Sequence, residues 1–172
     1  MDSCCFIDLA EAKLSQSDSK IADNIWYSEQ LLRASKAGEI QVCTSIITIA
    51  ECLHADGSHD PEVRDLFLRL LGSGTGVVQH IDCELFVVER ARDLRWNDDI
   101  NLSGIDGIHV ASGLIAQCAE FVTRDRNKGK SPIGQAKKIQ HLGMKVIEPR
   151  YTDVLPEGYK QGKLIRDERN DE

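Results

Sequence analysis

Apolar residues recur along the chain in two alternating patterns: short β-branched runs and longer stretches with helical spacing. The clearest helical stretch, at 63–71, keeps the spacing i, i+3, i+4, i+7, i+8 with Val63, Leu66, Phe67, Leu70 and Leu71. Asp60, Pro61 and Glu62 stand before it and supply a cap, a proline in the first helical position and an acid in the first turn. This order predicts a helix that starts at Pro61 and ends at Gly72.

The same reading predicts further helices and strands in alternation. Helices are expected at 21–37, 45–54, 105–118 and 132–142, with one more after Asp82 as its cap. Strands are expected at 40–43, 77–81, 120–123 and 144–147. Residues 4–7 are interpreted as the end of a strand or the turn after one, and Thr44 or Ser45 as the cap of the helix at 45–54.

Strands that alternate with helices over short connections predict an α/β fold. The expected architecture is a three-layer α/β/α sandwich with a mostly parallel central sheet. Residues 1–150 are predicted to form this domain, and residues 151–172 a charged C-terminal tail that packs loosely or serves a partner. Sites in such folds lie beyond the carboxyl ends of the strands.

Composition narrows the class of protein. A chain of 172 residues with 41% hydrophobic and 28% charged residues is typical of one soluble globular domain. The longest apolar run, near 46–50, is far too short to cross a bilayer, and no signal-peptide pattern opens the chain. We therefore expect a cytoplasmic protein with no membrane partner. The six cysteines contain no Cys-x-x-Cys pair and are expected to be reduced thiols among apolar neighbours.

Basic residues gather in one segment of an otherwise acidic chain. The net charge of −7 argues against broad affinity for nucleic acid. Between residues 124 and 150, however, eight Lys or Arg residues face only two acids: Arg124, Arg126, Lys128, Lys130, Lys137, Lys138, Lys145 and Arg150. Such a run is either a solvated surface or, beside a metal site, a place for a phosphodiester substrate.

Four acids stand where solubility alone does not explain them: Asp2, Glu51, Asp106 and Asp125. Acids in apolar surroundings must be protonated, paired or bound to a cation, and several that converge need a hard divalent ion. Asp106 has a second explanation as part of a helix cap with Ser103, and Asp125 as a turn residue. Glu51 interrupts an apolar helix and has no basic partner nearby in sequence.

Each of two acids is followed three residues later by a histidine, as Glu51-x-x-His54 and Asp106-x-x-His109. This spacing occurs in di-iron helix bundles, but the strand-rich segments of this chain contradict a bundle. We therefore expect His54 to be exposed and His109 to be a packed residue that supports the site.

Together these segments resemble the PIN domain, the fold of many metal-dependent ribonucleases and of VapC-type toxins. The resemblance covers residues 1–148 and consists of four motifs in order: Asp2-Ser3-Cys4-Cys5-Phe6-Ile7-Asp8-Leu9, Thr44-Ser45-Ile46-Ile47-Thr48-Ile49-Ala50-Glu51, Ile105-Asp106-Gly107-Ile108-His109-Val110-Ala111 and Phe121-Val122-Thr123-Arg124-Asp125-Arg126. It implies that the catalytic acids Asp2, Glu51, Asp106 and Asp125 hold Mg²⁺ or Mn²⁺.

By the same resemblance the protein is expected to be a metal-dependent endoribonuclease, with RNA held by Arg124, Arg126, Lys128 and Lys130. It implies a possible antitoxin protein as inhibitor and a possible homodimer. The chain departs from the family in two places. Only Met1 precedes Asp2, so the first strand is shortened, the start lies upstream, or Asp8 takes the role, although the hydroxyl of Ser3 favours Asp2. Asn127 stands where many members carry a further acid.

An incomplete first strand favours an alternative of another class, a catalytically weak PIN-like module that binds protein or RNA. Metal affinity separates this alternative from the nuclease.

Overall fold

Helices and short strands alternate along the chain, as the apolar pattern predicts. The computed structural model describes residues 1–14, 19–53, 59–126 and 129–161. Its helices are α1 (Ser3–Leu14), α2 (Ser19–Lys36), α3 (Ile47–Cys52), α4 (Pro61–Leu71), α5 (Leu85–Trp96), α6 (Gly104–Ile115) and α7 (Ala136–His141), with 3-10 turns η1 (Ile133–Gln135) and η2 (Pro149–Tyr151). Its strands are β1 (Cys43–Ser45), β2 (Gln79–Ile81), β3 (Glu120–Val122) and β4 (Lys145–Ile147).

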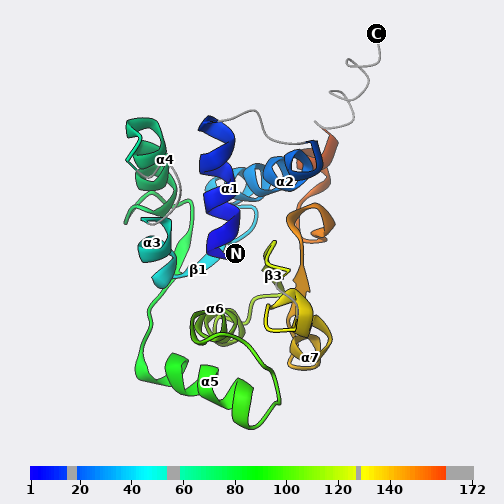
Figure 1. The fold of residues 1–172 in the computed structure, drawn as a ribbon. Helices are drawn as coiled ribbons and strands as arrows, with labels where there is room; N and C mark the ends of the chain where they lie inside the picture. Colours follow the sequence, from blue (N-terminus) through cyan, green and yellow to red (C-terminus); the bar gives the residue numbers. More distant parts are fainter. Residues whose placement is uncertain (15–18, 54–58, 127–128, 162–172) are drawn as a thin grey trace.

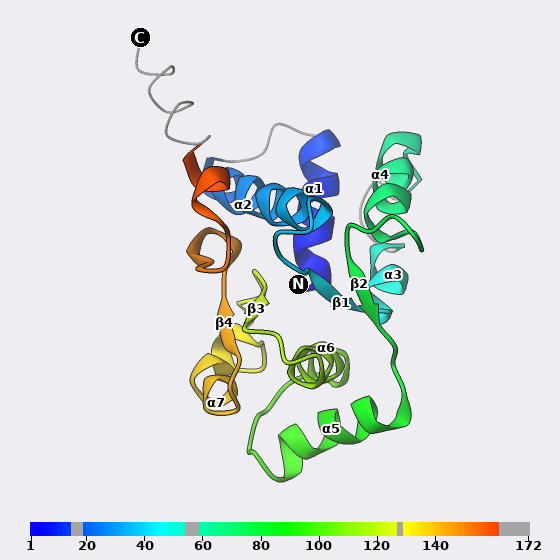
Figure 2. The ribbon, with the colours of Figure 1, turned by 180° about the vertical axis from the view of Figure 1, so that it is seen from behind.

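The described strands form two separate parallel pairs. β1 pairs with β2, with Cys43 opposite Gln79, and β3 pairs with β4, with Glu120 opposite Lys145. Helices α1, α2 and α4 lie on one side of the strands and α5 and α6 on the other (Figure 1 and Figure 2). The α/β class and the parallel strands are thus confirmed, but the strands do not join into one central sheet.

Two apolar clusters flank the strands. The first joins α1, α2 and α4 and includes Phe6, Leu9, Leu31, Leu32 and Leu71 among its buried residues. The second joins α5, α6 and α7 and includes Leu94, Val110, Phe121, Ile139 and Met144. In the second cluster Gly113 of α6 lies so close to Met144 that an added Cβ would be 2.9 Å from its Sδ. This close packing holds α6 against β3 and β4.

The N-terminal segment is a helix, so the expected strand or turn at 4–7 is wrong. Cys5 and Phe6 are buried together with Leu9 and Ala10, one turn later, which is the spacing of a helix face. The amide of Cys5 donates to the carbonyl of Asp2 at 3.2 Å, so the helix begins directly after Asp2.

Cap residues predict some helix starts and fail at others. Asp60 caps α4 by accepting from the Glu62 amide, and Ser103 caps α6 by accepting from the Asp106 amide. Asp82 does not cap α5, which begins after Glu84, and α3 begins after Ile46 without a side-chain cap. The Thr44 hydroxyl instead donates to the Met1 carbonyl at 2.9 Å. Residues 132–142 form η1 followed by α7 instead of one continuous helix.

The start of the predicted tail packs against the domain. Leu155 is buried in the first cluster, and Tyr159 packs beside that cluster and donates a hydrogen bond to Glu39. Residues 162–172 lie outside the described part. None of the described helices combines the length and the apolar character needed to span a membrane.

Candidate functional site

The four acids come from separate elements and lie near one another. Asp2 precedes α1, Glu51 lies in α3, Asp106 in the first turn of α6, and Asp125 follows β3. Partial burial raises the pKa of the Asp106 carboxyl, and the charges of Asp2 and Asp125 raise this pKa further, against the hydrogen bond from Ser103 and the charge of His109. Ser3, next to Asp2, also contacts Glu51. The chain therefore brings together the four acids that the motifs predict.

Asp2 is the most tightly held of these acids. Its side chain is buried, and its oxygens accept from the Ser3 amide at 2.8 Å and from the Thr123 hydroxyl at 2.6 Å. Its own amide donates to the carbonyl of Val122 at 2.9 Å. The start of α1 and the end of β3 thus fix Asp2 from both sides.

The hydroxyl of Thr123 links two of the acids. While it donates to Asp2, it accepts from the backbone amide of Asp125 at 3.1 Å. Thr123 is fully buried directly after β3. Sequence reasoning did not assign it a role, although its place between a buried strand and an acid was a usable signal. One side chain thereby sets the spacing of Asp2 and Asp125.

Glu51 has a partner that is remote in sequence. Nε2 of His109 lies 2.7 Å from a Glu51 carboxylate oxygen, and since an ionised carboxylate only accepts, Nε2 donates. His109 is buried, as expected, and its Nδ1 has no hydrogen-bond partner among the described residues. Partial burial acts to raise the pKa of Glu51, but the hydrogen bond and charge of His109, with a contribution from Ser3, outweigh it and lower this pKa.

Asp106 has the capping role that its sequence suggests and also belongs to the acid group. Its amide donates to the Ser103 hydroxyl oxygen at 3.1 Å, and the Ser103 hydroxyl donates back to its carboxylate at 2.6 Å. The two explanations are therefore compatible, because the cap orients a carboxylate that still lies within the field of Asp2 and Asp125.

Asp8 is already neutralised by a basic side chain. The Arg124 guanidinium donates through Nε and a terminal nitrogen to both carboxylate oxygens of Asp8, which is buried within α1. Such a two-bond arrangement satisfies the carboxylate. Asp2, in contrast, lies among the other acids, so the geometry favours Asp2 over Asp8 as the first member of the group.

The predicted substrate-binding residues differ in how they are engaged. Arg124 is bound to Asp8, and Arg126 pairs with Glu148 while its side chain stays 64% exposed. Lys130 is exposed, and Lys128 lies outside the described residues, as does Asn127. Further along, Lys138 and Lys145 pair with Asp99 and Asp153. Arg124 is thus part of the framework, while Arg126 and Lys130 face solvent.

The chemistry of this group suits a hard cation. Its donors are carboxylate and hydroxyl oxygens, which Mg²⁺ and Mn²⁺ prefer. Within the described residues, however, no three His, Cys, Asp or Glu side chains are placed closely enough to hold a metal ion. Glu51 points to His109 and Asp106 to Ser103, so a shared cation requires these two side chains to turn.

The chain matches no protein-family model, and neither curated proteins nor solved structures show a significant similarity to it. The resemblance to the PIN domain therefore stays a prediction from the four sequence motifs.

The Glu51–His109 contact predicts a pH dependence of stability. A lowered carboxyl pKa contributes stability above the ordinary pKa of Glu and loses it as the pH falls through the folded value. We expect the free energy of unfolding of the protein to exceed that of Glu51→Gln by up to about 1 kcal/mol near neutral pH, and this difference to shrink below about pH 4. Urea unfolding of both proteins, from neutral pH to below about pH 4, measures this difference in the free energy of unfolding. The exposed Glu157→Gln serves as control and should change stability little at any pH, and a Glu51→Gln difference that grows towards low pH would contradict the assignment.

Proposed function

We propose that this protein is a metal-dependent endoribonuclease with a PIN-like fold. The observation that carries the proposal is the gathering of Asp2, Glu51, Asp106 and Asp125 from distant segments: the charges of Asp2 and Asp125 add to the rise that burial causes in the pKa of Asp106, and Ser3 beside Asp2 contacts Glu51. Unbalanced negative charge of this kind is costly to a fold and is typical of functional sites. An all-oxygen donor set supports a hard cation as the missing counter-charge.

The residues of the site have distinct roles in this proposal. Asp2, held by Thr123 and Ser3, is the preorganised ligand, and Asp125 is held beside it by the same threonine. Glu51 and Asp106, which His109 and Ser103 orient, would complete the ligand set. When bound, Mg²⁺ or Mn²⁺ supplies an activated water and offsets charge on the attacked phosphate.

RNA is the proposed substrate because exposed basic residues adjoin the acids. In the ion pair of Arg126 with Glu148 the arginine side chain is exposed, and ion pairs at the surface contribute little to stability. Arg126 can therefore exchange Glu148 for a phosphate. We assign phosphate contacts to Arg126, Lys128 and Lys130, and a positioning role to Arg124 through Asp8. Contacts of this kind hold the backbone without selecting a sequence.

The finer architecture and the biological setting belong to the same proposal. A three-layer sandwich with one central sheet requires β1 and β3 to be joined, and a toxin role implies an inhibitory antitoxin protein and favours a homodimer. All of these follow the resemblance to VapC-type toxins.

Cleavage of a structured RNA tests the proposal. The protein is incubated with RNA in Mg²⁺, in Mn²⁺ or in EDTA, and the fragments are separated on a denaturing gel. We expect endonucleolytic fragments with either metal, none in EDTA, and recovery when metal is added in excess to the EDTA sample. Cutting that persists in EDTA, or no cutting with either metal, would overturn it.

A second candidate, a PIN-like interaction module without strong catalysis, is favoured by two observations. No three of the described candidate ligands are placed to share a cation, and Arg124 is committed to Asp8. Binding of RNA without cleavage, together with no Mn²⁺ binding by calorimetry, is the result that selects this candidate.

A further inference from the structure

A groove where three helices meet is lined by apolar and basic side chains that the proposed nuclease does not use. Helix α1 packs against both α2 and α4 (Figure 1 and Figure 2), and the groove lies along this junction. Its volume is about 270 Å³, near the lower end of the range of ligand pockets. This is room for roughly nine water-sized groups at about 30 Å³ each, which suits a slim chain better than a ring system.

The floor of the groove is apolar. Leu9 of α1, Leu32 of α2 and Val77, which precedes β2, are buried at its base. Leu66 and Leu70, one turn apart on α4, are half-buried and line the groove from the α4 side. Apolar surface that is left open in this way gains free energy when a hydrocarbon chain covers it.

The rim of the groove is basic, because each of the three helices places a cation one turn after a leucine of the lining. Side chains three or four residues apart lie on the same face of a helix. The pairs are Leu9–Lys13, Leu32–Lys36 and Leu66–Arg69. Arg33 adds a fourth cation, and Glu29 is the single acid among the described lining residues. Four basic side chains thus face one acid here, in a protein whose net charge is −7.

Three of the four cations are left without an ion pair. Arg69 pairs with Asp65 on its own helix. Lys13, Arg33 and Lys36 are exposed, and in the described part of the chain none of them has an ion-pair partner. A cluster of one sign of charge attracts ligands of the opposite sign. The rim is therefore complementary to an anion.

We propose that this groove binds a free medium-chain fatty acid, with its acyl tail on the leucine floor and its carboxylate among Lys13, Arg33 and Lys36. An apolar floor beside unpaired cations matches a ligand that has one apolar chain and one anionic end. The cations supply charge-assisted hydrogen bonds to the carboxylate. The floor takes the chain out of water, which tightens binding about fourfold for each buried methylene group.

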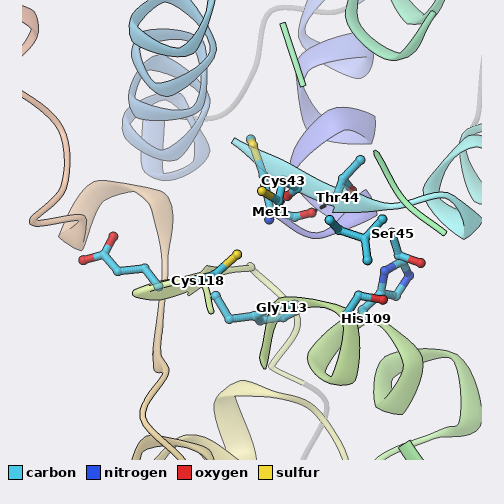
Figure 3. Close-up of a pocket in the computed structure, with 11 residues that line it drawn as sticks. Met1, Cys43, Thr44, Ser45, His109, Gly113 and Cys118 are labelled. Atoms are coloured by element: carbon cyan, nitrogen blue, oxygen red, sulfur yellow. Dashed lines mark hydrogen bonds between the residues drawn. The ribbon is translucent and has the colours of Figure 1, made fainter. Parts of the chain in front are cut away.

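The groove is separate from the smaller pocket beside the Glu51–His109 contact. Figure 3 shows that pocket, which Thr44, Ser45 and His109 help to line and whose volume is about 10 Å³. These three residues are not among the described residues that line the groove. Binding of a fatty acid there does not depend on the proposed nuclease, and its test uses no cleavage.

Calorimetric titration of the whole protein with decanoate tests the proposal. Octanoate and dodecanoate vary the chain length, whereas decan-1-ol and decyltrimethylammonium keep the decyl chain and remove or reverse the charge. We expect one decanoate per chain, about tenfold weaker binding of octanoate, and little further gain with dodecanoate once the groove is filled. Decanol should bind at least about fivefold more weakly than decanoate, and the ammonium ion should not bind. Added salt should weaken the binding of decanoate more than that of decanol, because it screens exposed charges.

A pair of rim substitutions locates the carboxylate. Arg33→Gln combined with Lys36→Gln should weaken decanoate binding about fivefold and leave decanol binding unchanged, since only the carboxylate meets these cations. The matched control combines Arg95→Gln on α5 with Lys137→Gln on α7. These two residues are also exposed and carry the same charges, but they do not line the groove, so the control should bind both ligands as the unaltered protein does.

A floor substitution locates the acyl chain. Leu66→Ala should weaken the binding of decanoate and of decanol alike, by about fivefold, because it removes apolar surface that the chain covers. Leu68, two residues along α4, is 60% exposed and does not line the groove, so Leu68→Ala should change neither affinity. Thermal unfolding of both variants confirms that each is folded during the titration.

Two other occupants of the groove are distinguished by sedimentation. The protein is centrifuged alone and with phosphatidylglycerol vesicles. Pelleting with vesicles that the Arg33/Lys36 double variant abolishes would assign the groove to a membrane surface, and a dimer that this variant dissociates would assign it to a second copy of the chain. Either result overturns the proposal. It is also overturned if decanoate does not bind, if affinity does not rise from octanoate to decanoate, if decanol binds as tightly as decanoate, or if the two double variants behave alike.

Discussion

Replacing Asp106 with Asn is expected to reduce metal-dependent RNA cleavage by about 10²-fold or more while it stabilises the metal-free protein. The loss follows because a metal ion supplies several kcal/mol of transition-state stabilisation and each 1.4 kcal/mol is about tenfold in rate. The gain follows because partial burial and, in addition, the charges of Asp2 and Asp125 raise the pKa of Asp106, so its charge opposes folding at neutral pH. Asn still accepts the hydrogen bond from Ser103.

The measurement pairs cleavage rates in Mn²⁺ with thermal unfolding in EDTA and in Mn²⁺. The matched control is Asp99→Asn, because Asp99 is an exposed acid that pairs with Lys138 and has a positive φ of 53°, which Asn tolerates. Asp99→Asn should cleave RNA at the rate of the unaltered protein. A variant Asp106→Asn that is less stable in EDTA, or that cleaves normally, would show that Asp106 only supports the Ser103 cap of α6.

Asp8→Asn is expected to lower the free energy of unfolding strongly, whereas Asp106→Asn should raise it. Removing the carboxylate leaves the half-buried Arg124 guanidinium without its partner, and breaking a buried ion pair from one side costs about 3–5 kcal/mol. Because the Arg124 side chain is 29% exposed, water compensates part of this charge, and we expect about 2–3 kcal/mol in the free energy of unfolding. Urea unfolding at neutral pH measures this loss.

A second ion pair on the surface gives the control for Asp8. Asp65 pairs with Arg69 one turn later on α4, and both side chains are mostly exposed, so Asp65→Asn should change stability by less than about 0.5 kcal/mol. Adding Arg124→Met to Asp8→Asn should recover part of the loss, since it removes the unpaired charge. Equal effects of Asp8→Asn and Asp65→Asn would mean that the Asp8–Arg124 pair is not a framework contact.

These two variants separate the acids of the site from the acids of the framework. The Asp106 carboxylate should lower the stability of the metal-free protein and support metal-dependent cleavage. Asp8, in contrast, should stabilise the fold without taking part in the chemistry. The distinction matters because Asp2 and Asp8 both lie in the first motif, and sequence spacing alone leaves either as the first ligand. The ion pair of Asp8 with Arg124 is what separates them.

The sequence by itself determined features whose causes lie within a few residues. Asp60 and Pro61 predict the start of α4, and Ser103 predicts the start of α6, because a cap bonds to amides two or three residues away. Apolar spacing located the strands and most of the helices to within a few residues, but it missed α1. The run at 4–7 was wrongly interpreted as the end of a strand or a turn, because so short an apolar run does not separate a strand from a helix; the burial of Leu9 and Ala10 one turn later shows that it belongs to a helix.

Only the tertiary structure decided which of the distant side chains meet. His109 reaches Glu51 across 58 positions of the chain, and Arg124 reaches Asp8 across 116. Thr123 holds Asp2 because β3 lies beside the start of α1. Local propensity carries no information about such contacts, since they depend on how helices and strands pack. The tertiary structure also decided that β1 pairs with β2 and β3 with β4, because pairing between strands joins residues that no local pattern connects.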